Sequence, residues 1–169
     1  VIVADNSIER LRHLDELFAG TVGTRHATAG MIEALVLRAD LVIGAALVPG
    51  ALTPRLVRRE WLARMQPGSV LVDVSIDQGG CFETSRPTTH SDPVFIVDDI
   101  VHYCVTNMPG AVARSSTFAL NNATLPFVLA LADKGCQHAL VDDPHLTAGL
   151  NVQGGRVTHP AVAEALRST

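Results

Sequence analysis

The sequence predicts a doubly wound α/β fold, in which helices cover both faces of a parallel β-sheet. Short apolar runs at 1–4, 40–46 and 69–74 are separated by stretches with the apolar periodicity of helices. The runs are continuously apolar and do not alternate with polar residues, which indicates strands covered on both faces. Strands that alternate with helices form βαβ units, and such units build a parallel sheet.

The first elements carry recognisable start and stop residues. The first apolar run ends at Asp5, and Ser7 is then placed to cap a helix. Gly20 is expected to end this helix, because glycine is common directly after a helix. A short strand over 21–26 and a second helix over 28–38 are expected next.

The strand predicted over 40–46 is followed by another set of helix signals. Thr53 is a capping residue type and Pro54 suits the first helical position, so a helix is expected to begin there. Residues 67–68, a Pro-Gly pair, are expected to end it before the strand at 69–74. The inward-facing residues of this helix are expected to be Leu56, Val57, Trp61 and Met65.

The pattern changes after residue 110, which divides the chain into residues 1–110 and a mainly helical segment, 111–169. One long helix is expected over 113–134, interrupted at Pro126. The Gly-Gly pair at 154–155 predicts a hairpin, because it lies between two short stretches that each place one apolar residue between polar ones. Further elements are expected as strands at 94–97 and 101–105, a weaker helix near 136–149, hairpin arms at 151–153 and 156–158, and a closing helix at 160–166.

Composition argues against several function classes. The net charge is −4, and arginines 55, 58, 59 and 64 share one predicted helix without interleaved aromatics, which favours a solvated helix face over a nucleic-acid surface. The cysteines form no CxxC motif and the histidines show no ligand spacing, so neither a metal site nor a disulfide framework is expected. No membrane span and no signal peptide pattern are visible, which predicts a cytoplasmic protein.

In doubly wound sheets, ligands bind beyond the carboxyl ends of the strands. The residues directly after the predicted strands are Asp5, 46–50, 75–80 and 106–109. A carboxylate at the position of Asp5 can accept hydrogen bonds from a ribose hydroxyl of NAD. An acid at the beginning of the following helix is the alternative interpretation, and both stay open.

Asp77 lies just beyond the strand at 69–74. Gly79 and Gly80 let the backbone turn sharply and leave room for a flat ligand ring to approach. A carboxylate there can hold a polar substrate group or a developing positive charge. The alternative is an aspartate that only initiates a turn.

Three neighbours of this loop are open to more than one interpretation. Asp73, inside the strand run, is either structural or faces solvent. Arg86 either braces the loop or touches a cofactor. Cys81 has no histidine on a neighbouring element to activate it, and we interpret it as a structural thiol.

Five stretches of the chain share motifs with one known family: 39–51, 76–89, 107–110, 116–124 and the hairpin at 151–158. Through them the chain resembles the bacterial L-alanine dehydrogenases, and the resemblance covers nearly the whole sequence. The loop Ile-Asp-Gln-Gly-Gly-Cys-Phe-Glu-Thr-Ser-Arg-Pro-Thr-Thr at 76–89 is specific, whereas the related transhydrogenase α subunits carry a looser version of it. The resemblance implies reversible deamination of L-alanine to pyruvate and ammonia, with hydride passed to NAD.

The resemblance also implies a set of site residues. Asp77 corresponds to the catalytic aspartate of the family, and Asp5 to the carboxylate at the adenosine ribose. Ala27 stands where some members have a serine that contacts the adenosine, so that contact is not expected here. The implied cofactor-binding residues are Asp5, Arg10, Ala46, Leu47, Val74, Ser75, Ile76, Asp77, Arg86, Val105, Thr106, Asn107 and Met108.

Other parts implied by the resemblance do not occur in this sequence. The family's substrate-binding arginine and lysine and its catalytic histidine lie in an N-terminal domain, and a first strand with a glycine-rich loop precedes the position of Val1. We therefore expect a Rossmann-type sheet lacking its first βα unit, inactive as an isolated fragment, with 111–169 packing on the N-terminal domain. The family suggests a homo-oligomer, specifically a hexamer. The alternatives are a truncated, non-catalytic paralogue acting as an interaction module, and the NAD-binding domain of a transhydrogenase α subunit.

Overall fold

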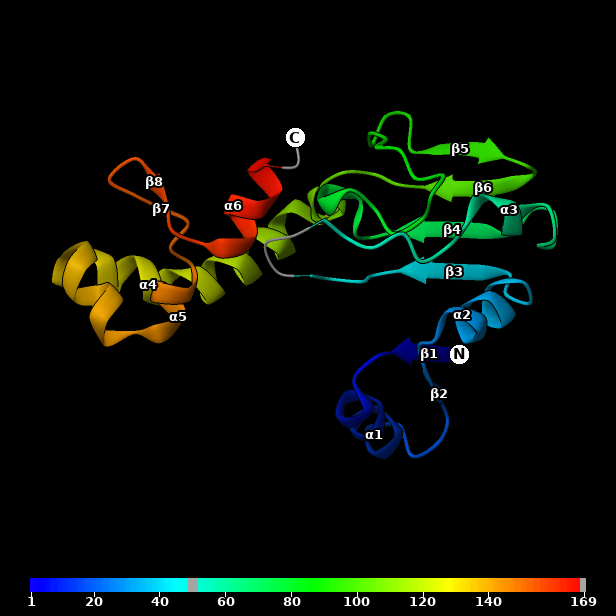
Figure 1. The fold of residues 1–169 in the computed structure, drawn as a ribbon, viewed down its shortest axis with the longest axis horizontal. Coiled ribbons are helices and arrows are strands. Elements are labelled where there is room, and N and C mark those ends of the chain that lie inside the picture. Colours follow the sequence, from blue (N-terminus) through cyan, green and yellow to red (C-terminus); the bar gives the residue numbers. More distant parts are fainter. Residues whose placement is uncertain (49–51, 168–169) are drawn as a thin grey trace. The chain divides into compact units, whose positions relative to one another are not determined.

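The computed structural model describes residues 1–48 and 52–167, which form two compact units (Figure 1). Pro49 and Gly50, predicted to follow a strand, lie outside the described residues. We call the two units the sheet unit, Val1–Leu47 with Thr53–Thr106, and the helical unit, Val48–Leu52 with Asn107–Thr169.

The sheet unit begins with a parallel strand pair joined by a helix. Strands β1 (Ile2–Asp5) and β2 (Gly23–His26) pair in parallel, and α1 (Ile8–Leu17) connects them. The predicted cap is confirmed, because the Ser7 hydroxyl accepts a hydrogen bond from the Arg10 backbone N–H at 3.2 Å. This unit of strand, helix and parallel strand is the βαβ pattern that the sequence predicts.

The larger sheet has the strand order β3-β4-β6-β5. Its first three strands are parallel neighbours, whereas β5 runs antiparallel to β6 and forms the edge. The antiparallel edge follows from a tight turn at Asp98 and Asp99, both with positive φ (50° and 61°). Its strands are β3 (Leu41–Gly44), β4 (Val70–Asp73), β5 (Val94–Val97) and β6 (Ile100–Tyr103).

The two sheets are not continuous with each other. Within the described residues, β1 pairs only with β2 and β3 only with β4, so each keeps one edge without a strand partner. The prediction that both faces of these strands are covered is wrong for β1 and β3, because Ile2, Leu41 and Ile43 are all more than half exposed. Exposed apolar side chains on a sheet face form a surface suited to packing against other elements.

The core lies on the other face of the larger sheet. Leu71 and Ile100 from the sheet pack with Trp61, Leu62 and Phe82, all nearly fully buried. Helix α2 (Ala29–Val36), which begins after the cap at Thr28, contributes Val36 to the same cluster.

The helix predicted to begin at Pro54 is wrong. Helix α3 spans only Arg59–Leu62, and the preceding residues run alongside the loop that follows β4. The backbone N–H groups of Leu56 and Val57 donate to the Cys81 carbonyl, and Glu83 N–H donates to the Val57 carbonyl. These long-range bonds satisfy the backbone groups that a helix would otherwise pair, so tertiary contacts override the local signal.

The helical unit is dominated by α4 (Ala113–Asp142), which begins after a short 3-10 turn, η2 (Met108–Val112). Pro126 lies within α4 and does not end it, whereas Gly135 has non-helical angles (φ 73°, ψ 159°) and kinks it. The predicted hairpin with Gly154 and Gly155 at its turn and the closing helix are confirmed. The remaining elements are α5 (Pro144–Ala148), β7 (Val152–Gln153), β8 (Arg156–Val157) and α6 (Pro160–Arg167).

Candidate functional site

A cavity of about 290 Å³ lies beyond the carboxyl ends of β3 and β4. These strands are parallel neighbours, so the segments that follow them leave the sheet at the same edge. The two segments supply all of its walls. The lining residues are Ala45, Ala46, Leu47, Val74, Ser75, Asp77 and Gln78.

The two walls of this cavity are fastened to each other. The Ser75 hydroxyl donates to the Ala46 carbonyl at 2.7 Å, and the Val74 backbone N–H donates to the Gly44 carbonyl at 2.8 Å. Asp77 stands on a short 3-10 turn, η1 (Ile76–Gln78), with its side chain exposed, while Ile76 points into the core. The lining of the cavity is therefore mostly apolar, with Ser75 and Gln78 as neutral polar residues and Asp77 as its one carboxylate.

The carboxylate of Asp73 organises the loop that carries Asp77. Asp73 is 0% exposed, and it accepts hydrogen bonds from the backbone N–H groups of Ser75 at 3.0 Å and Cys81 at 2.8 Å. The Ser85 hydroxyl donates to the same carboxylate. Of the two interpretations of Asp73, the structural one is therefore right. The two-residue period of β4, which places Asp73 on the buried face with Leu71, is the signal that identifies it.

Gly80 has a different role from the one predicted. A Cβ at Gly80, where φ is +80°, would lie 2.7 Å from Asp73 Oδ2 and 2.9 Å from Ser85 Cβ. The absence of a side chain thus lets the Asp73 carboxylate approach the backbone, so the space goes to a protein group and not to a ligand ring. Gly79 has φ 95° and ends the η1 turn, which agrees with the predicted sharp reversal.

Arg55 was missed as a loop contact by sequence reasoning. It lies outside α3, and its guanidinium donates to the carbonyls of Gly80 at 3.2 Å and Phe82 at 2.7 Å. The expectation that it belongs to a solvated helix face is therefore wrong. A side chain 25 residues from its partner along the chain leaves no local pattern by which to find it.

Arg86 braces the loop, the first of its two interpretations. Its guanidinium carbon lies 4.1 Å from the centroid of the Phe95 ring, a cation–π contact. Phe95 in turn stacks on His102, with ring centroids 4.8 Å apart. A role for Arg86 at a cofactor stays a prediction.

His102 is a buried neutral side chain. Its Nδ1–H lies 3.0 Å from the Ile100 carbonyl, which it can donate to, and its Nε2 then accepts from the Thr84 hydroxyl at 2.7 Å. Burial lowers the pKa of His102 below the ordinary value, with the charge of Arg86 adding to this effect. The neutral imidazole therefore anchors Thr84, two residues before Arg86.

The thiols near the loop are not nucleophiles. Burial, together with the charge of the adjacent Asp73 carboxylate, raises the pKa of Cys81 to about 12. Burial also raises the pKa of Cys104. Both side chains stay protonated at neutral pH, as expected for structural thiols.

Asp5 and Arg10 lie at the other, two-stranded sheet. Asp5 Oδ1 accepts a hydrogen bond from the Ser7 backbone N–H at 2.7 Å, so Asp5 does support the beginning of α1. The side chain of Arg10 is exposed in the first turn of that helix. The predicted ribose contact of Asp5 neither follows from this bond nor conflicts with it, because the bond engages one carboxylate oxygen.

The last group of predicted site residues straddles the boundary between the two units. Val105 is fully buried, and Thr106 N–H donates to the Thr88 carbonyl at 3.2 Å, so both are held within the sheet unit. Asn107, with φ 53°, and Met108 begin the helical unit. Within the cavity, the structure thus brings together five of the predicted residues: Ala46, Leu47, Val74, Ser75 and Asp77.

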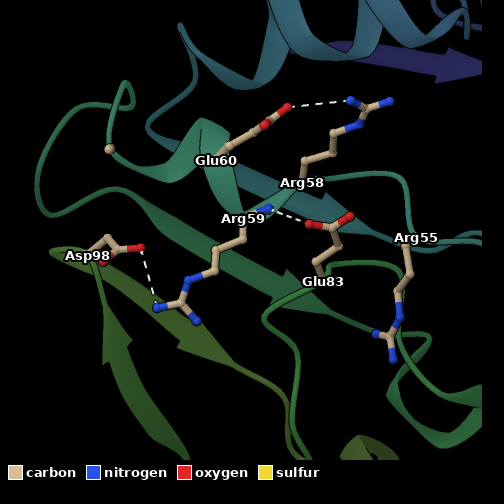
Figure 2. A pocket seen from close by; sticks show the side chains of 7 residues that line it. Arg55, Arg58, Arg59, Glu60, Glu83 and Asp98 are labelled. Atoms are coloured by element: carbon tan, nitrogen blue, oxygen red, sulfur yellow. Dashed lines mark hydrogen bonds and ion pairs between the residues drawn. The ribbon is translucent and has the colours of Figure 1, made fainter.

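A larger hollow, of about 780 Å³, does not coincide with the predicted site. Figure 2 shows Arg58 paired with Glu60 and the Arg59 guanidinium reaching Asp98, 3.9 Å away. The Arg59 backbone N–H donates to Glu83 at 2.8 Å. The arginines that line this hollow are thus engaged: Arg58 and Arg59 by neighbouring carboxylates, and Arg55 by backbone carbonyls. The hollow is therefore an open surface on which positive and negative charges compensate each other.

The described part of the chain shows neither a metal centre nor a membrane-spanning helix. No group of three or more His, Cys, Asp or Glu side chains there is arranged to hold a metal ion. Among the helices of residues 1–48 and 52–167, none has both the length and the apolar character needed to cross a bilayer.

Comparison with known proteins gives a consistent set of matches. The family model "Alanine dehydrogenase/PNT, C-terminal domain" matches residues 1–160. The chain is 62% identical over 165 residues to an alanine dehydrogenase of Halomonas elongata, covering 98% of this chain and 44% of that protein. It is 54% identical over 166 residues to the alanine dehydrogenase of Mycolicibacterium smegmatis, covering 98% of this chain and 45% of that protein.

Solved structures give the same picture. A structure of L-alanine dehydrogenase matches with a TM-score of 0.83 and 48% identity, over 99% of this chain and 46% of that one. A transhydrogenase from Sinorhizobium meliloti matches with a TM-score of 0.71 and 26% identity, over 95% and 42%. The chain therefore spans less than half the length of these relatives.

Proposed function

This chain belongs to the alanine dehydrogenase/PNT family, through its C-terminal domain, and from that premise we propose that it is the nucleotide-binding part of an NAD-dependent alanine dehydrogenase. The reaction is the reversible conversion of L-alanine to pyruvate and ammonia. NAD, when bound, supplies the hydride acceptor. The identity to the solved structure of L-alanine dehydrogenase (48%) is well above that to the transhydrogenase structure (26%), which favours the dehydrogenase over the alternative.

The cavity at the ends of β3 and β4 fits one half of a dinucleotide. Its volume of about 290 Å³ is near the lower end for small-molecule sites, which suits a single ring and its ribose. Ala46, Leu47 and Val74 offer apolar walls for a flat ring, and Asp77 stands at the rim. This combination is the observation that carries the proposal.

Asp77 is the residue of this chain that we assign to the reaction. Its exposed carboxylate can stabilise the positive charge that develops on the substrate nitrogen as hydride leaves the substrate carbon. It can also orient the water that attacks that carbon. The proton of the amine passes to a base outside this chain.

The architecture proposed is a Rossmann-type domain completed by residues outside this chain. Parallel strands β1 and β3 each present an unpaired edge, which one further parallel strand between them would satisfy. In the proposed division, residues 1–110 hold NAD, and 111–169 pack on the substrate domain. The exposed apolar side chains of α4, such as Phe118, Leu120 and Leu129, support the second assignment. We also propose that the complete enzyme forms a homo-oligomer.

A chimera tests the function directly. This chain would replace the matching C-terminal region of the Halomonas elongata enzyme, and NAD reduction would be followed with L-alanine as substrate. We expect alanine-dependent turnover within about tenfold of the parent enzyme, because the resident residues of the cavity are those the reaction needs. A folded chimera that binds NAD without oxidising alanine would favour a non-catalytic paralogue instead.

A further inference from the structure

The strongest unexplained feature of the sheet unit is the buried carboxylate of Asp73. It ends β4, it is 0% exposed, and both of its oxygens are engaged. Burying a carboxylate costs several kcal/mol unless hydrogen bonds compensate, and an apolar side chain on this face would avoid that cost. The position is therefore poorly explained by core packing alone.

The partners of Asp73 all lie on the loop that carries Asp77. Oδ1 accepts from the Ser75 backbone N–H at 3.0 Å, and Oδ2 accepts from the Cys81 backbone N–H at 2.8 Å. The Ser85 hydroxyl also donates to Oδ2. Ser75 and Cys81 lie on either side of the η1 turn, so a single carboxylate fixes both ends of the segment that contains Asp77.

The surrounding contacts restrict the loop further. The carbonyl of Gly80 is held by Arg55, and the missing Cβ of Gly80 allows Asp73 Oδ2 to come close. Ser75, whose backbone amide is held by Asp73, also donates a hydrogen bond from its hydroxyl to the Ala46 carbonyl in the opposite cavity wall. A shift of the Asp73 carboxylate would thus move the cavity rim together with the turn.

We propose that Asp73 is a positioning residue, whose buried carboxylate sets the place of Asp77 at the cavity rim by holding the backbone amides of Ser75 and Cys81. This inference rests on the proposed function, and it assigns to Asp73 no contact with substrate or cofactor. Placement of a reacting group matters because an error of about 1 Å can cost about 100-fold in rate.

The test uses a full-length alanine dehydrogenase that carries this chain as its C-terminal region. Asp73→Asn keeps the size of the side chain but turns one oxygen into an N–H donor, which then faces an amide or hydroxyl donor. We expect kcat to fall about 100-fold, while KM for NAD changes less than about threefold, because the apolar walls remain. Asp15→Asn, an exposed aspartate on α1, is the matched control and should change neither constant.

Hydrogen exchange supplies the readout that does not depend on activity. Peptides containing Ser75 and Cys81 should exchange faster in Asp73→Asn than in the parent, while those of β6 should not change. Ser85→Ala removes one donor and leaves both amide bonds, so it provides a milder variant if Asp73→Asn does not fold. We expect it to loosen the same peptides and to lower kcat less, again with KM for NAD retained.

Clear outcomes would overturn the inference. Either a folded Asp73→Asn enzyme with kcat within about twofold of the parent, or a loss of kcat without faster exchange at Ser75 and Cys81, excludes a positioning role. If only Ser85→Ala folds, unchanged kcat and exchange in that variant exclude it. If the parent enzyme does not oxidise alanine, the proposed function fails. The positioning role of Asp73 is then judged by hydrogen exchange only, and unchanged exchange at Ser75 and Cys81 in Asp73→Asn overturns it.

Discussion

The carboxylate of Asp73 lies against the backbone of Gly80, in space that a side chain at Gly80 would need: a Cβ there would lie 2.7 Å from Asp73 Oδ2. The backbone of Gly80 also has φ +80°, a conformation that L-residues adopt with strain. The loop that carries Asp77 thus depends on a glycine for both its shape and its buried acid.

Gly80→Ala is therefore expected to destabilise the protein by about 2 kcal/mol, from backbone strain and from the displaced carboxylate together. Chemical denaturation followed by circular dichroism measures the change. Gly30→Ala is the control, because Gly30 lies in α2 with no atom within 4 Å of its Cβ position. Alanine there should be neutral or stabilising by up to about 1 kcal/mol. Equal stability of the two variants would contradict the close contact at Gly80.

Asp77→Asn in the full-length enzyme should lower kcat by about 100-fold or more and leave the Kd for NAD nearly unchanged. The reason is that the carboxylate acts on charge that develops during reaction, whereas the apolar walls hold the ring. Steady-state kinetics and NAD titration measure the two effects. Asp92→Asn, an exposed aspartate that does not line the cavity, is the control. A near-normal kcat for Asp77→Asn would refute the assigned role.

The buried His102 predicts a pH dependence of stability. The pKa of His102 is lowered in the folded protein, mainly by burial and also by the charge of Arg86, against the opposing effects of the hydrogen bond to the Ile100 carbonyl and of the Asp73 and Asp98 charges. The unfolded chain thus takes up a proton near pH 6.5 that the folded chain does not. The free energy of unfolding is therefore expected to fall as pH drops below about 6.5, by at most about 1.4 kcal/mol per pH unit from this group.

Denaturation curves from pH 5 to pH 8, recorded for the parent and for His102→Gln, measure this contribution. Other groups titrate in the same range, so the difference between the two proteins isolates the histidine. The difference should be constant above about pH 7 and should narrow below it. A difference that does not vary with pH would show that His102 titrates alike in both states.

Sequence patterns predicted the strands and the strand ends that border the cavity, because those features depend on local sequence. The apolar runs at 1–4, 40–46 and 69–74 place the strand ends to within two residues, and parallel pairing then brings the last two ends together. No local pattern predicts that segment 53–58 is extended, since its backbone hydrogen bonds join it to Gln78, Cys81 and Glu83.

The roles of the loop residues were harder to assign for the same reason. Asp73 and Asp77 are both aspartates near the end of the same apolar run, and they differ in burial. Asp73 shares the buried face of β4 with Leu71, while Asp77 is exposed on the turn that follows. Gly80 was linked to a ligand because the glycine pair lies near the predicted site. Its real neighbour, Asp73, becomes apparent only once the loop has folded back onto β4.

Thiol labelling should separate the three cysteines. Cys136 is exposed, whereas Cys81 and Cys104 are buried with raised pKa values. Brief treatment of the native protein with iodoacetamide at pH 8 is expected to modify Cys136 alone, as read by peptide mass spectrometry. The denatured protein, in which all three should react, is the control. Rapid native labelling of Cys81 would mean that the loop closed by Asp73 opens readily.

The chain by itself is expected to bind NAD only weakly, with a Kd well above micromolar. The cavity at β3 and β4 fits one half of the dinucleotide, while Asp5, the predicted ribose ligand, lies on a separate sheet. The pyrophosphate between those halves normally lies at a helix N-terminus that follows a glycine-rich loop, and this sequence contains no such loop. Isothermal titration of the chain and of the chimera with NAD compares the two, and we expect at least about a tenfold gain in the chimera. Micromolar binding by the chain alone would show that the missing anion site is not needed, and the proposed completion by a further strand would then lose its main functional argument.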